Sequence, residues 1–427
     1  MVLNLLSEAT VGLVDTLMVG RLGRDAVAAV GVGIQILGSV QVVTFAVGTG
    51  TVALVARHVG AGEPQAVRRV VGQSMVLAFT LASLAILPVL VWTEAAVRLF
   101  GVEQAVVEQS VAFTRLIMLA IPASAVGFVV ASALRAAGDT RTPLAIGLVM
   151  NVLNIALNYV LIFGAFGLPA LGVRGSALSS AIAFTLGSTI GVVLLARGGL
   201  RVTFSRADLR PDRHIMTRVI RIGVPTGIEQ FAMQMGFLTY LVFASTYGAA
   251  AVASYFIGVR ILAFAFLPGI GFATAAAALV GQNLGAGAPE QAERAGYAAT
   301  RLAIRLMSSA GLLLFVFAVP IARLFVDDAA VIEDTRWFIY ALAVCQPFMA
   351  IDYTLGGSLR GAGDTRFPLM TLFVGLYGCR LVFAWLVTHV LHLTTPWLWL
   401  AMVGDYAARS ALKTWRFRGR AWQRVRV

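Results

Sequence analysis

Long apolar stretches alternate with short polar segments from one end of the chain to the other. A helix needs about 20 apolar residues to cross about 30 Å of hydrocarbon, and each stretch approaches or exceeds that length. The stretches are rich in Ala and Leu and lack the alternation over about ten residues that marks a barrel strand, so we expect helices. The pattern predicts twelve spans, at residues 1–19, 27–56, 67–92, 106–134, 143–165, 173–196, 218–246, 251–281, 293–322, 331–358, 368–390 and 396–414.

The polar segments show that the sequence contains two copies of one unit. The segment L-R-A-A-G-D-T-R-T-P-L at Leu134–Leu144 returns as L-R-G-A-G-D-T-R-F-P-L at Leu359–Leu369, 225 positions later. The same offset carries Gly60–Gly62 onto Gly285–Gly287. A period of this length indicates a duplicated domain-sized unit. Because six spans is an even number, both copies face the same way, and we predict an all-α polytopic membrane protein with two six-helix bundles related by a pseudo-twofold axis along the membrane normal.

Composition agrees with a membrane protein. The chain is 59% hydrophobic and 12% charged, with a mean hydropathy of +0.87, which excludes an ordinary soluble globular domain. The net charge of +13 comes from arginines in the short connections, where they act as topology signals. The connections that carry most arginines are predicted to be cytoplasmic. Residues 1–19 lack a basic start and a cleavage site, so they are interpreted as a span.

The predicted organisation has four parts: an N-terminal six-helix lobe at 1–196, a cytoplasmic interlobe linker at 197–214, a C-terminal six-helix lobe at 215–414 and a basic cytoplasmic tail at 415–427. The linker is the long polar connection between the copies. Because the tail mixes Trp415 and Trp422 with arginines, it is interpreted as a headgroup anchor, with nucleic-acid binding as the weaker alternative. Cys345 and Cys379 lie in apolar segments, so no disulfide is expected.

The two repeated arginine-rich loops are predicted to be tight turns. A glycine in the left-handed conformation closes one helix, and the aspartate after it caps the next. The neighbouring arginines are expected to hold each turn at the inner surface, with a gating role as the alternative. The predicted turn residues are Arg135, Gly138 and Asp139 in the first copy and Arg360, Gly363 and Asp364 in the second.

Asp15 is the main candidate for function, because a charged aspartate in mid-membrane costs about 2.5 to 3.5 kcal/mol and functional groups are the usual reason for one. Its equivalent in the second copy is Tyr240. Asn154 and Asn158 share one helix face, and Ser179 and Ser180 add hydroxyl groups in the next span. If these faces meet, the first lobe contains a polar cluster with one acid. The alternative is ordinary helix–helix hydrogen bonding, worth about 0.6 kcal/mol per pair.

The second copy carries its own candidates, Glu229 and Asp352, which are interpreted as acids that could attract a cationic substrate in the cavity. Glu229 has the alternative role of a first-turn charge favoured by the helix dipole. Arg380 is expected either to pair with an acid such as Asp352 or to reach the interface. The histidines show no metal-ligand spacing, and we expect no metal site and no cofactor.

Several segments together resemble the multidrug and toxic compound extrusion (MATE) family, in particular its DinF-like branch. They are V-D-T-L-M-V-G-R-L-G at 14–23, A-R-H-V-G-A-G at 56–62, G-Q-N-L-G-A-G at 281–287, the two repeated loops and R-F-R-G-R-A-W at 416–422. The resemblance implies two six-helix bundles around a central cleft, and efflux of organic cations driven by inward proton or sodium movement.

The resemblance also assigns positions. Asp15 falls on the family's coupling aspartate, Asn154 and Asn158 on an N-x-x-x-D pattern, and Ser180 on a threonine. Asn158 stands where an acid is often found. Met349 occupies the place of the aspartate of the sodium-coupled branch, and this weakens the sodium interpretation.

The sequence therefore predicts a bacterial inner-membrane, multi-pass, monomeric antiporter with cytoplasmic termini, which exports organic cations or amphipathic toxic compounds against protons or, less favoured, sodium. In this hypothesis Asp15 alternates between a protonated and a cation-binding state. A flippase for lipid-linked oligosaccharides of the same superfamily is the near alternative. A membrane enzyme or receptor is the alternative from another class, but the sequence offers no paired acids, HExxH or Cys/His site for an enzyme.

Overall fold

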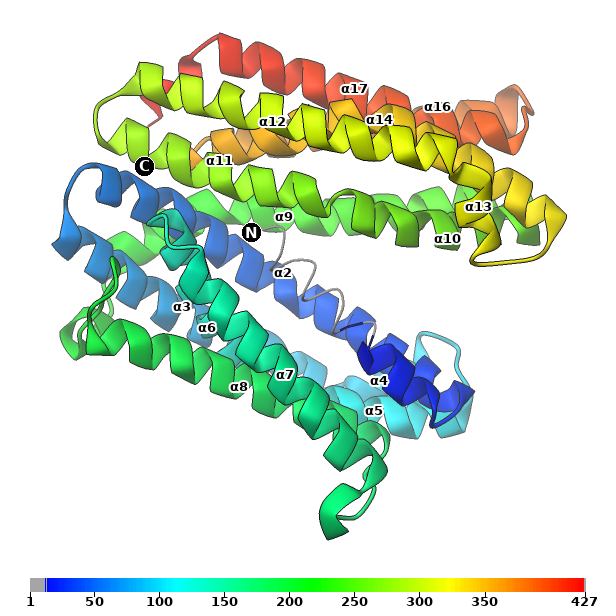
Figure 1. The fold of residues 1–427 in the computed structure, drawn as a ribbon, viewed down its shortest axis with the longest axis horizontal. Helices are drawn as coiled ribbons and strands as arrows, with labels where there is room; N and C mark the ends of the chain where they lie inside the picture. The colour runs from blue at the N-terminus through cyan, green and yellow to red at the C-terminus, as the bar shows by residue number, and fades with distance from the viewer. Residues whose placement is uncertain (1–11, 13, 426–427) are drawn as a thin grey trace. The chain divides into compact units, whose positions relative to one another are not determined.

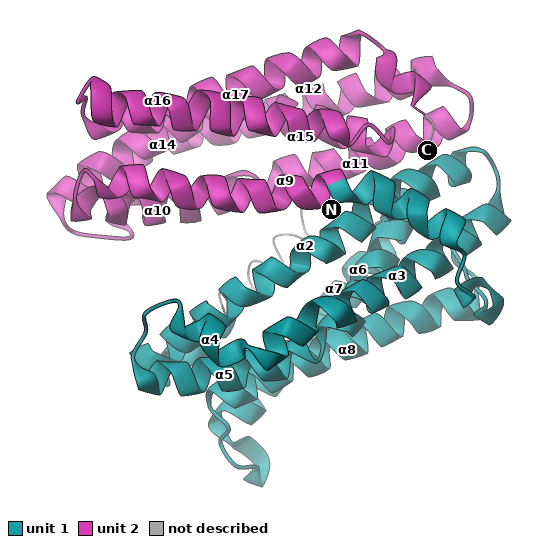
Figure 2. Cartoon of the chain, turned by 180° about the vertical axis from the view of Figure 1, so that it is seen from behind, with its two compact units in different colours: residues 1–224 teal, residues 225–427 magenta. Residues whose placement is uncertain are grey.

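The computed structural model describes residue 12 and residues 14–425, and the regular structure of these residues is entirely helical (Figure 1). The chain divides into two compact units, residues 1–224 and residues 225–427 (Figure 2). The prediction of an all-α polytopic chain is confirmed. Most of the first predicted span lies outside the described residues, and residues 14–20 are its described helical end.

Unit 1 is built around α2, which packs against α3, α5 and α6, while α6 and α7 pack against α8. The most apolar part of α7 is only 17% buried. The helices of unit 1 are α2 (Arg24–Gly60), α3 (Pro64–Val91), α4 (Thr93–Arg98), α5 (Gln104–Met118), α6 (Ile121–Ala136), α7 (Arg141–Phe163), η1 (Ala165–Gly167), α8 (Val173–Arg197) and η2 (Arg206–Leu209).

Unit 2 is built around α14, whose apolar part is 61% buried and which packs against α10, α11, α12 and α17. The helix α9 (Arg213–Ser245) crosses from unit 1 into unit 2. The other helices of unit 2 are α10 (Ala249–Ala265), α11 (Leu267–Gly285), α12 (Pro289–Val316), α13 (Ala318–Arg323), α14 (Ala329–Gly361), α15 (Arg366–Leu372), the π-helical η3 (Phe373–Leu381), α16 (Val382–Trp385), the π-helical η4 (Leu386–Val390), α17 (Thr395–Arg418) and η5 (Ala421–Arg424).

The 225-residue offset also relates the helix boundaries. α3 begins at Pro64 and ends at Val91, and α12 begins at Pro289 and ends at Val316. The copies differ where proline interrupts a helix. α2 is continuous, but its counterpart breaks at Phe266 into α10 and α11, and Pro268 stands where the first copy has Val43. Proline removes a helical hydrogen bond and clashes with the preceding turn, which accounts for the break.

The number of membrane-spanning segments is consistent with the twelve predicted spans, if the segments outside the length and hydropathy test are included. Among the described residues, eight helical segments are long and apolar enough to cross a membrane, and the α5–α6 pair, bent by 50°, makes a ninth. The partly described first span, the long α9 and the charge-bearing α17 fall outside that test. The predicted spans 106–134 and 251–281 are therefore each made of two helices.

The predicted linker is an ordered part of unit 1. The buried side chain of Gln73 on α3 donates to the carbonyl oxygens of Asp208 and Arg210 (2.7 Å each) and accepts from the Asp212 amide (2.8 Å). Asp208 accepts from the Ser205 amide (2.7 Å) and forms an ion pair with Arg68 (3.1 Å). Unit 1 extends to Val224, ten residues past the predicted linker end, because the linker and the first turns of α9 pack on α2 and α3.

Asp208 lies in this aqueous segment, and its environment favours the charged form. Partial burial opposes ionisation, but the hydrogen bonds from Ser205 and the nearby Arg68 guanidinium outweigh it and hold the pKa of the Asp208 carboxyl below its ordinary value. The carboxylate thus ties the linker to α3 at neutral pH.

The prediction that the C-terminal tail is a headgroup anchor is wrong for Trp422, one of its two tryptophans. Trp422 is fully buried, stacks on Phe417 with the ring centroids 4.5 Å apart, and donates from Nε1 to the Phe417 carbonyl (2.8 Å). Trp415 is 68% exposed, as an interfacial residue would be. The helix α17 runs on to Arg418 and η5 folds back on it, so Phe417 and Trp422 of the tail belong to the core of unit 2.

Candidate functional site

The predicted polar residues of unit 1 meet in one hydrogen-bonded cluster. The Asn158 amide donates to the Asp15 carboxylate and to Asn154 Oδ1 (3.1 Å), and the Asn154 amide donates to Ser180 Oγ (3.1 Å). The Ser179 hydroxyl donates to Asn158 Oδ1. Four of these side chains are buried, whereas Asp15 is partly exposed. The cluster therefore joins the described end of the first span to α7 and α8, and the condition that the faces meet is fulfilled.

The cluster has the composition of a cation or proton site. Asp15 is its one ionisable group, and in the described part of the chain no basic side chain lies within 4 Å of its carboxylate. The remaining members are neutral and fixed by helix packing. An acid that is bound by a neutral amide, and left without a fixed countercharge, is available to an exchangeable cation.

Unit 2 places its predicted acids differently, because both already have basic partners. Glu229 Oε1 lies 2.7 Å from Arg360 Nη2, and Asp352 Oδ1 lies 2.6 Å from Lys413 Nζ. Glu229 lies in the middle of α9, sixteen residues past Arg213, so its interpretation as a first-turn charge is wrong. Both acids belong to unit 2, whereas the Asp15 cluster belongs to unit 1.

Three charged residues of α17 form ion pairs in unit 2 that the sequence did not predict. Asp405, Arg409 and Lys413 are spaced by four residues along one face of α17. Asp405 binds Arg409 through two hydrogen bonds (2.5 and 2.8 Å), and Arg409 reaches to 4.0 Å from Asp352. The regular spacing in D-Y-A-A-R-S-A-L-K is a signal that could have identified this face, and the repeat offset places Asp405 on Ser180.

Arg380 does not pair with Asp352. It lies in η3, is 1% exposed, and forms an ion pair with Asp405 at 2.7 Å. The rings of Phe237, Tyr240 and Tyr406 surround its guanidinium at 5.3 to 5.9 Å. The close approach of α17 requires Gly375, since a Cβ there would lie 2.4 Å from Asp405 Oδ1.

The repeated turns partly match their prediction. Gly138 and Gly363 adopt the left-handed conformation, with φ of +88° and +89°. Asp139 caps α7 by accepting from the Arg141 and Thr142 amides (3.0 Å each). Asp364 instead accepts from Arg416 Nε (2.9 Å).

The two arginines of these turns also differ. Arg135 donates to Ser132 Oγ (3.3 Å) on its own helix, whereas Arg360 turns into unit 2 toward Glu229. The role of these arginines at the inner surface stays a prediction, and the contact with Glu229 is an additional feature of Arg360.

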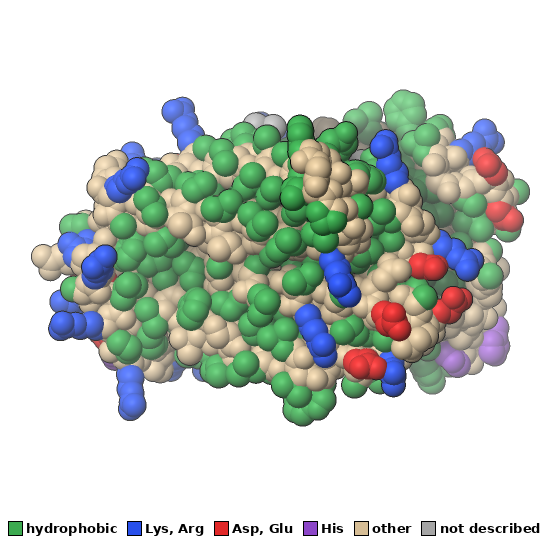
Figure 3. Space-filling view, turned by 90° about the horizontal axis from the view of Figure 1, so that it is seen from below, with side chains coloured by type: hydrophobic (Ala, Val, Ile, Leu, Met, Phe, Trp, Pro, Cys, Tyr) green, Lys and Arg blue, Asp and Glu red, His purple; other side chains and the backbone are tan. Residues whose placement is uncertain are grey.

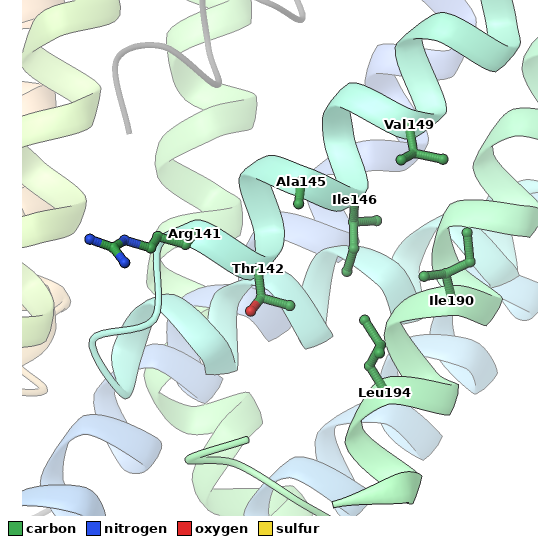
Figure 4. A pocket seen from close by; sticks show the side chains of 7 residues that line it. All are labelled: Arg141, Thr142, Ala145, Ile146, Val149, Ile190 and Leu194. Atoms are coloured by element: carbon green, nitrogen blue, oxygen red, sulfur yellow. The ribbon is translucent and has the colours of Figure 1, made fainter. Parts of the chain in front are cut away.

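A groove of about 330 Å³ between α7 and α8 lies apart from the cluster. Figure 4 shows Ile146, Ile190 and Leu194 pointing toward one another there, while Arg141 extends away from them. Its lining is almost wholly apolar, which suits a lipid-facing surface and not a coupling site. Among the described residues, no three His, Cys, Asp or Glu side chains gather in a way that could hold a metal ion.

The fold and the half-buried acid of unit 1 define a polytopic membrane transporter made of two copies of one six-span unit. The family model MatE matches residues 1–160 and 225–386, once in each copy. The chain therefore belongs to the MATE family of multidrug and toxic compound extrusion transporters.

Known proteins are similar along nearly the whole chain. The Probable multidrug resistance protein NorM of Thermotoga maritima is 31% identical over 420 residues, covering 97% of this chain and 89% of that protein. The protein of the same name from Burkholderia pseudomallei is 32% identical over 423 residues, covering 96% and 89%. The fold of a MOP superfamily transporter from Pyrococcus furiosus superposes with a TM-score of 0.91 at 23% identity, covering 100% of this chain and 95% of that one.

Proposed function

We propose that the protein is a secondary active efflux transporter that exports organic cations or amphipathic toxic compounds in exchange for protons. Two relatives above 30% identity carry the name of multidrug resistance proteins, which supports this substrate class. We place the protein in the bacterial cytoplasmic membrane as a monomer, with the arginine-rich turns and both termini in the cytoplasm, because arginine-rich connections stay on that side.

The observation that carries the proposal is the acid of the unit 1 cluster. Asp15 is partly exposed, its described partner is the neutral Asn158, and the described residues give it no fixed countercharge. A proton or a cationic substrate can therefore neutralise it, but not both at once. If the protonated and the substrate-bound forms favour different orientations of the two lobes, competition at Asp15 produces exchange.

Proton coupling is favoured over sodium coupling by the partners of the other acids. Glu229 is paired with Arg360 and Asp352 with Lys413, so neither carboxylate is left as a free ligand for a metal cation. Sodium needs several oxygen ligands, and a tethered ammonium or guanidinium group removes the charge that would attract it. The membrane potential adds about 2.3 kcal/mol per transported charge per 100 mV to either gradient.

The test uses purified protein in proteoliposomes loaded with a fluorescent organic cation. We expect an imposed pH gradient to drive dye movement and a sodium gradient of equal size to drive none. Asp15→Asn should lower the pH-driven rate about tenfold or more, the range of a coupling free energy, whereas Asp25→Asn, whose carboxylate is exposed beside Arg24, should not. Movement at the parental rate in Asp15→Asn would reject the role of Asp15, and movement driven by sodium alone would reject proton coupling.

The flippase alternative gains some support from unit 2, which buries or partly buries four basic residues, Arg360, Arg380, Arg409 and Lys413. Each of them faces an acid, so little positive charge is free to bind a pyrophosphate. The same proteoliposomes discriminate the two functions when they carry a labelled lipid-linked oligosaccharide in place of the dye. Gradient-driven dye movement without transbilayer movement of that lipid supports efflux.

A further inference from the structure

A second groove, of about 660 Å³, opens on unit 1 among α4, α5 and α8. One face of α5 forms its floor, where the lining residues recur at three- to four-residue spacing from Gln104 to Leu116. The groove lies at the end of unit 1 away from the arginine-rich turns, because α5 begins after α3 has crossed from Pro64 to Val91. It shares no lining residue with the Asp15 cluster or with the α7–α8 groove.

The groove contains charges of both signs that do not neutralise each other. Glu108 and Arg115 project from α5 and Arg174 from the first turn of α8, and all three are exposed. In residues 14–425 no contact under 4 Å pairs any of them, whereas Glu94 on the rim is paired with Arg98 at 2.6 Å. Figure 3 shows acidic and basic side chains close together at one end of a largely apolar face. Such an arrangement leaves room for a ligand that itself carries both charges.

Unit 2 shows that the repeat does not require this groove. Glu333 occupies the place of Glu108, but it is satisfied by Arg336 and by Trp337 Nε1 (3.0 Å). Trp337 stands where unit 1 has Ala112, and Tyr340 stands where it has Arg115. Tyr340 packs on Phe315 with ring centroids 4.6 Å apart. Aromatic side chains therefore occupy in unit 2 the region that is open in unit 1. Unit 1 has the equivalent acid, Glu108, but no counterpart of Arg336 or Trp337.

We propose that this groove binds the headgroup of phosphatidylethanolamine, a zwitterionic aminophospholipid. Arg115 and Arg174 contact the phosphate, Glu108 accepts from the ammonium, and the partly exposed apolar side chains of Val111 and Leu116 contact the glycerol and the first acyl carbons. Arg115 lies eleven residues from the start of α5, which is about 16 Å along the helix at 1.5 Å per residue. A lipid phosphate is the anion available beside a spanning helix at that depth, to which an arginine side chain can snorkel.

The proposal does not depend on the transport mechanism, so it can be tested by lipid binding alone. Purified protein is mixed with phosphatidylethanolamine, phosphatidylglycerol or phosphatidylcholine of the same acyl chains, and retained lipid is counted by native mass spectrometry. We expect about tenfold stronger retention of phosphatidylethanolamine, the order of one hydrogen bond to a charged group. Phosphatidylglycerol lacks the ammonium, and the methylated ammonium of phosphatidylcholine has no N–H to donate to Glu108.

Three variants separate the parts of the site. Glu108→Gln should reduce phosphatidylethanolamine to the level of phosphatidylglycerol, Arg115→Gln should weaken all three lipids, and Ala112→Trp should close the groove as Trp337 does in unit 2. Glu290→Gln and Arg294→Gln, at an exposed pair on α12, are matched controls and should change nothing. Equal retention of the three lipids by the parent, or parental selectivity in both Glu108→Gln and Arg115→Gln, would overturn the proposal. If Ala112→Trp does not fold, Glu108→Gln and Arg115→Gln still test the proposal.

Discussion

The two units of this transporter are copies of one repeated sequence but treat buried charge in opposite ways. Unit 1 keeps one partly exposed acid, Asp15, among neutral amides and hydroxyls. In unit 2, a chain of ion pairs along η3, α14 and α17 joins Arg380, Asp405, Arg409, Asp352 and Lys413, and Glu229 on α9 pairs separately with Arg360. The difference teaches that the repeat preserves helix boundaries such as those of α3 and α12, while equivalent positions inside the helices acquire unrelated chemistry.

The physical cost of changing protonation differs accordingly. A charge in mid-membrane costs several kcal/mol unless it is paired, and removing one member of a buried pair leaves the other uncompensated, at about 3 to 5 kcal/mol. Arg380 and Asp405, at 1% and 0% side-chain exposure, therefore each depend on the other as a countercharge. Asp15 is bound by a neutral amide and is partly exposed, so we expect it to gain or lose a cation at much lower cost.

The largest expected effect is the loss of Asp405. Asp405→Asn leaves Arg380 and Arg409 without their shared carboxylate, although Asp352 remains 4.0 Å from Arg409. We expect the free energy of unfolding in detergent to fall by about 3 kcal/mol. Asp25→Asn, at an exposed pair, should cost less than about 1 kcal/mol. Equal stability of the two variants would mean that the unit 2 network does not stabilise the fold.

A smaller effect on stability is expected in unit 1, together with a larger one on function. Asn158→Ala removes the donor to Asp15 and to Asn154 and the acceptor of the Ser179 hydroxyl, which we expect to lower the free energy of unfolding by about 2 kcal/mol, at about 0.6 kcal/mol per hydrogen bond. Cation efflux driven by a pH gradient should nevertheless fall well below the parental rate. Asn283→Ala, which removes an amide bonded within α11, is the control. A stability loss like that of Asp405→Asn with unchanged efflux would remove the contrast between the units.

The sequence was sufficient for the features that depend on one helix or on the repeat. The repeat offset predicted the paired helices, and the four-residue spacing of Asn154 and Asn158 predicted a shared face that does reach Ser180. The left-handed Gly138 and Gly363 followed from their place between two helices. In each case the responsible interaction is local or repeated, so it can be recognised in the residues themselves.

What the sequence left open depends on contacts between distant segments. Arg409 and Lys413 lie near the basic end of the chain, and only the packing of α17 on α14 and η3 shows that they serve as countercharges. Trp422 has the sequence context of an interfacial residue, but η5 folds it onto Phe417. Arg360 and Arg135 occupy the same place in the repeated turn. Arg135 donates to Ser132 on its own helix, whereas Arg360 donates to Glu229, which is 131 residues away.

The smallest expected effect concerns the ion pair that unit 1 makes outside the membrane, between Asp208 of the linker and Arg68. The pKa of Asp208 is lowered in the folded protein, so its contribution to stability is present above the unfolded pKa and is lost as the pH falls through the folded pKa. Asp208→Asn should therefore lower the free energy of unfolding by about 1 kcal/mol at pH 7 and at pH 5, because water competes for this half-exposed pair. The difference from the parent should shrink below about pH 4. Thermal unfolding of both proteins across that range measures it, and a difference that grows on acidification would show that Asp208 does not act through its charge. If Asp208→Asn instead costs as much as Asp405→Asn, the distinction between aqueous and membrane-buried pairs fails.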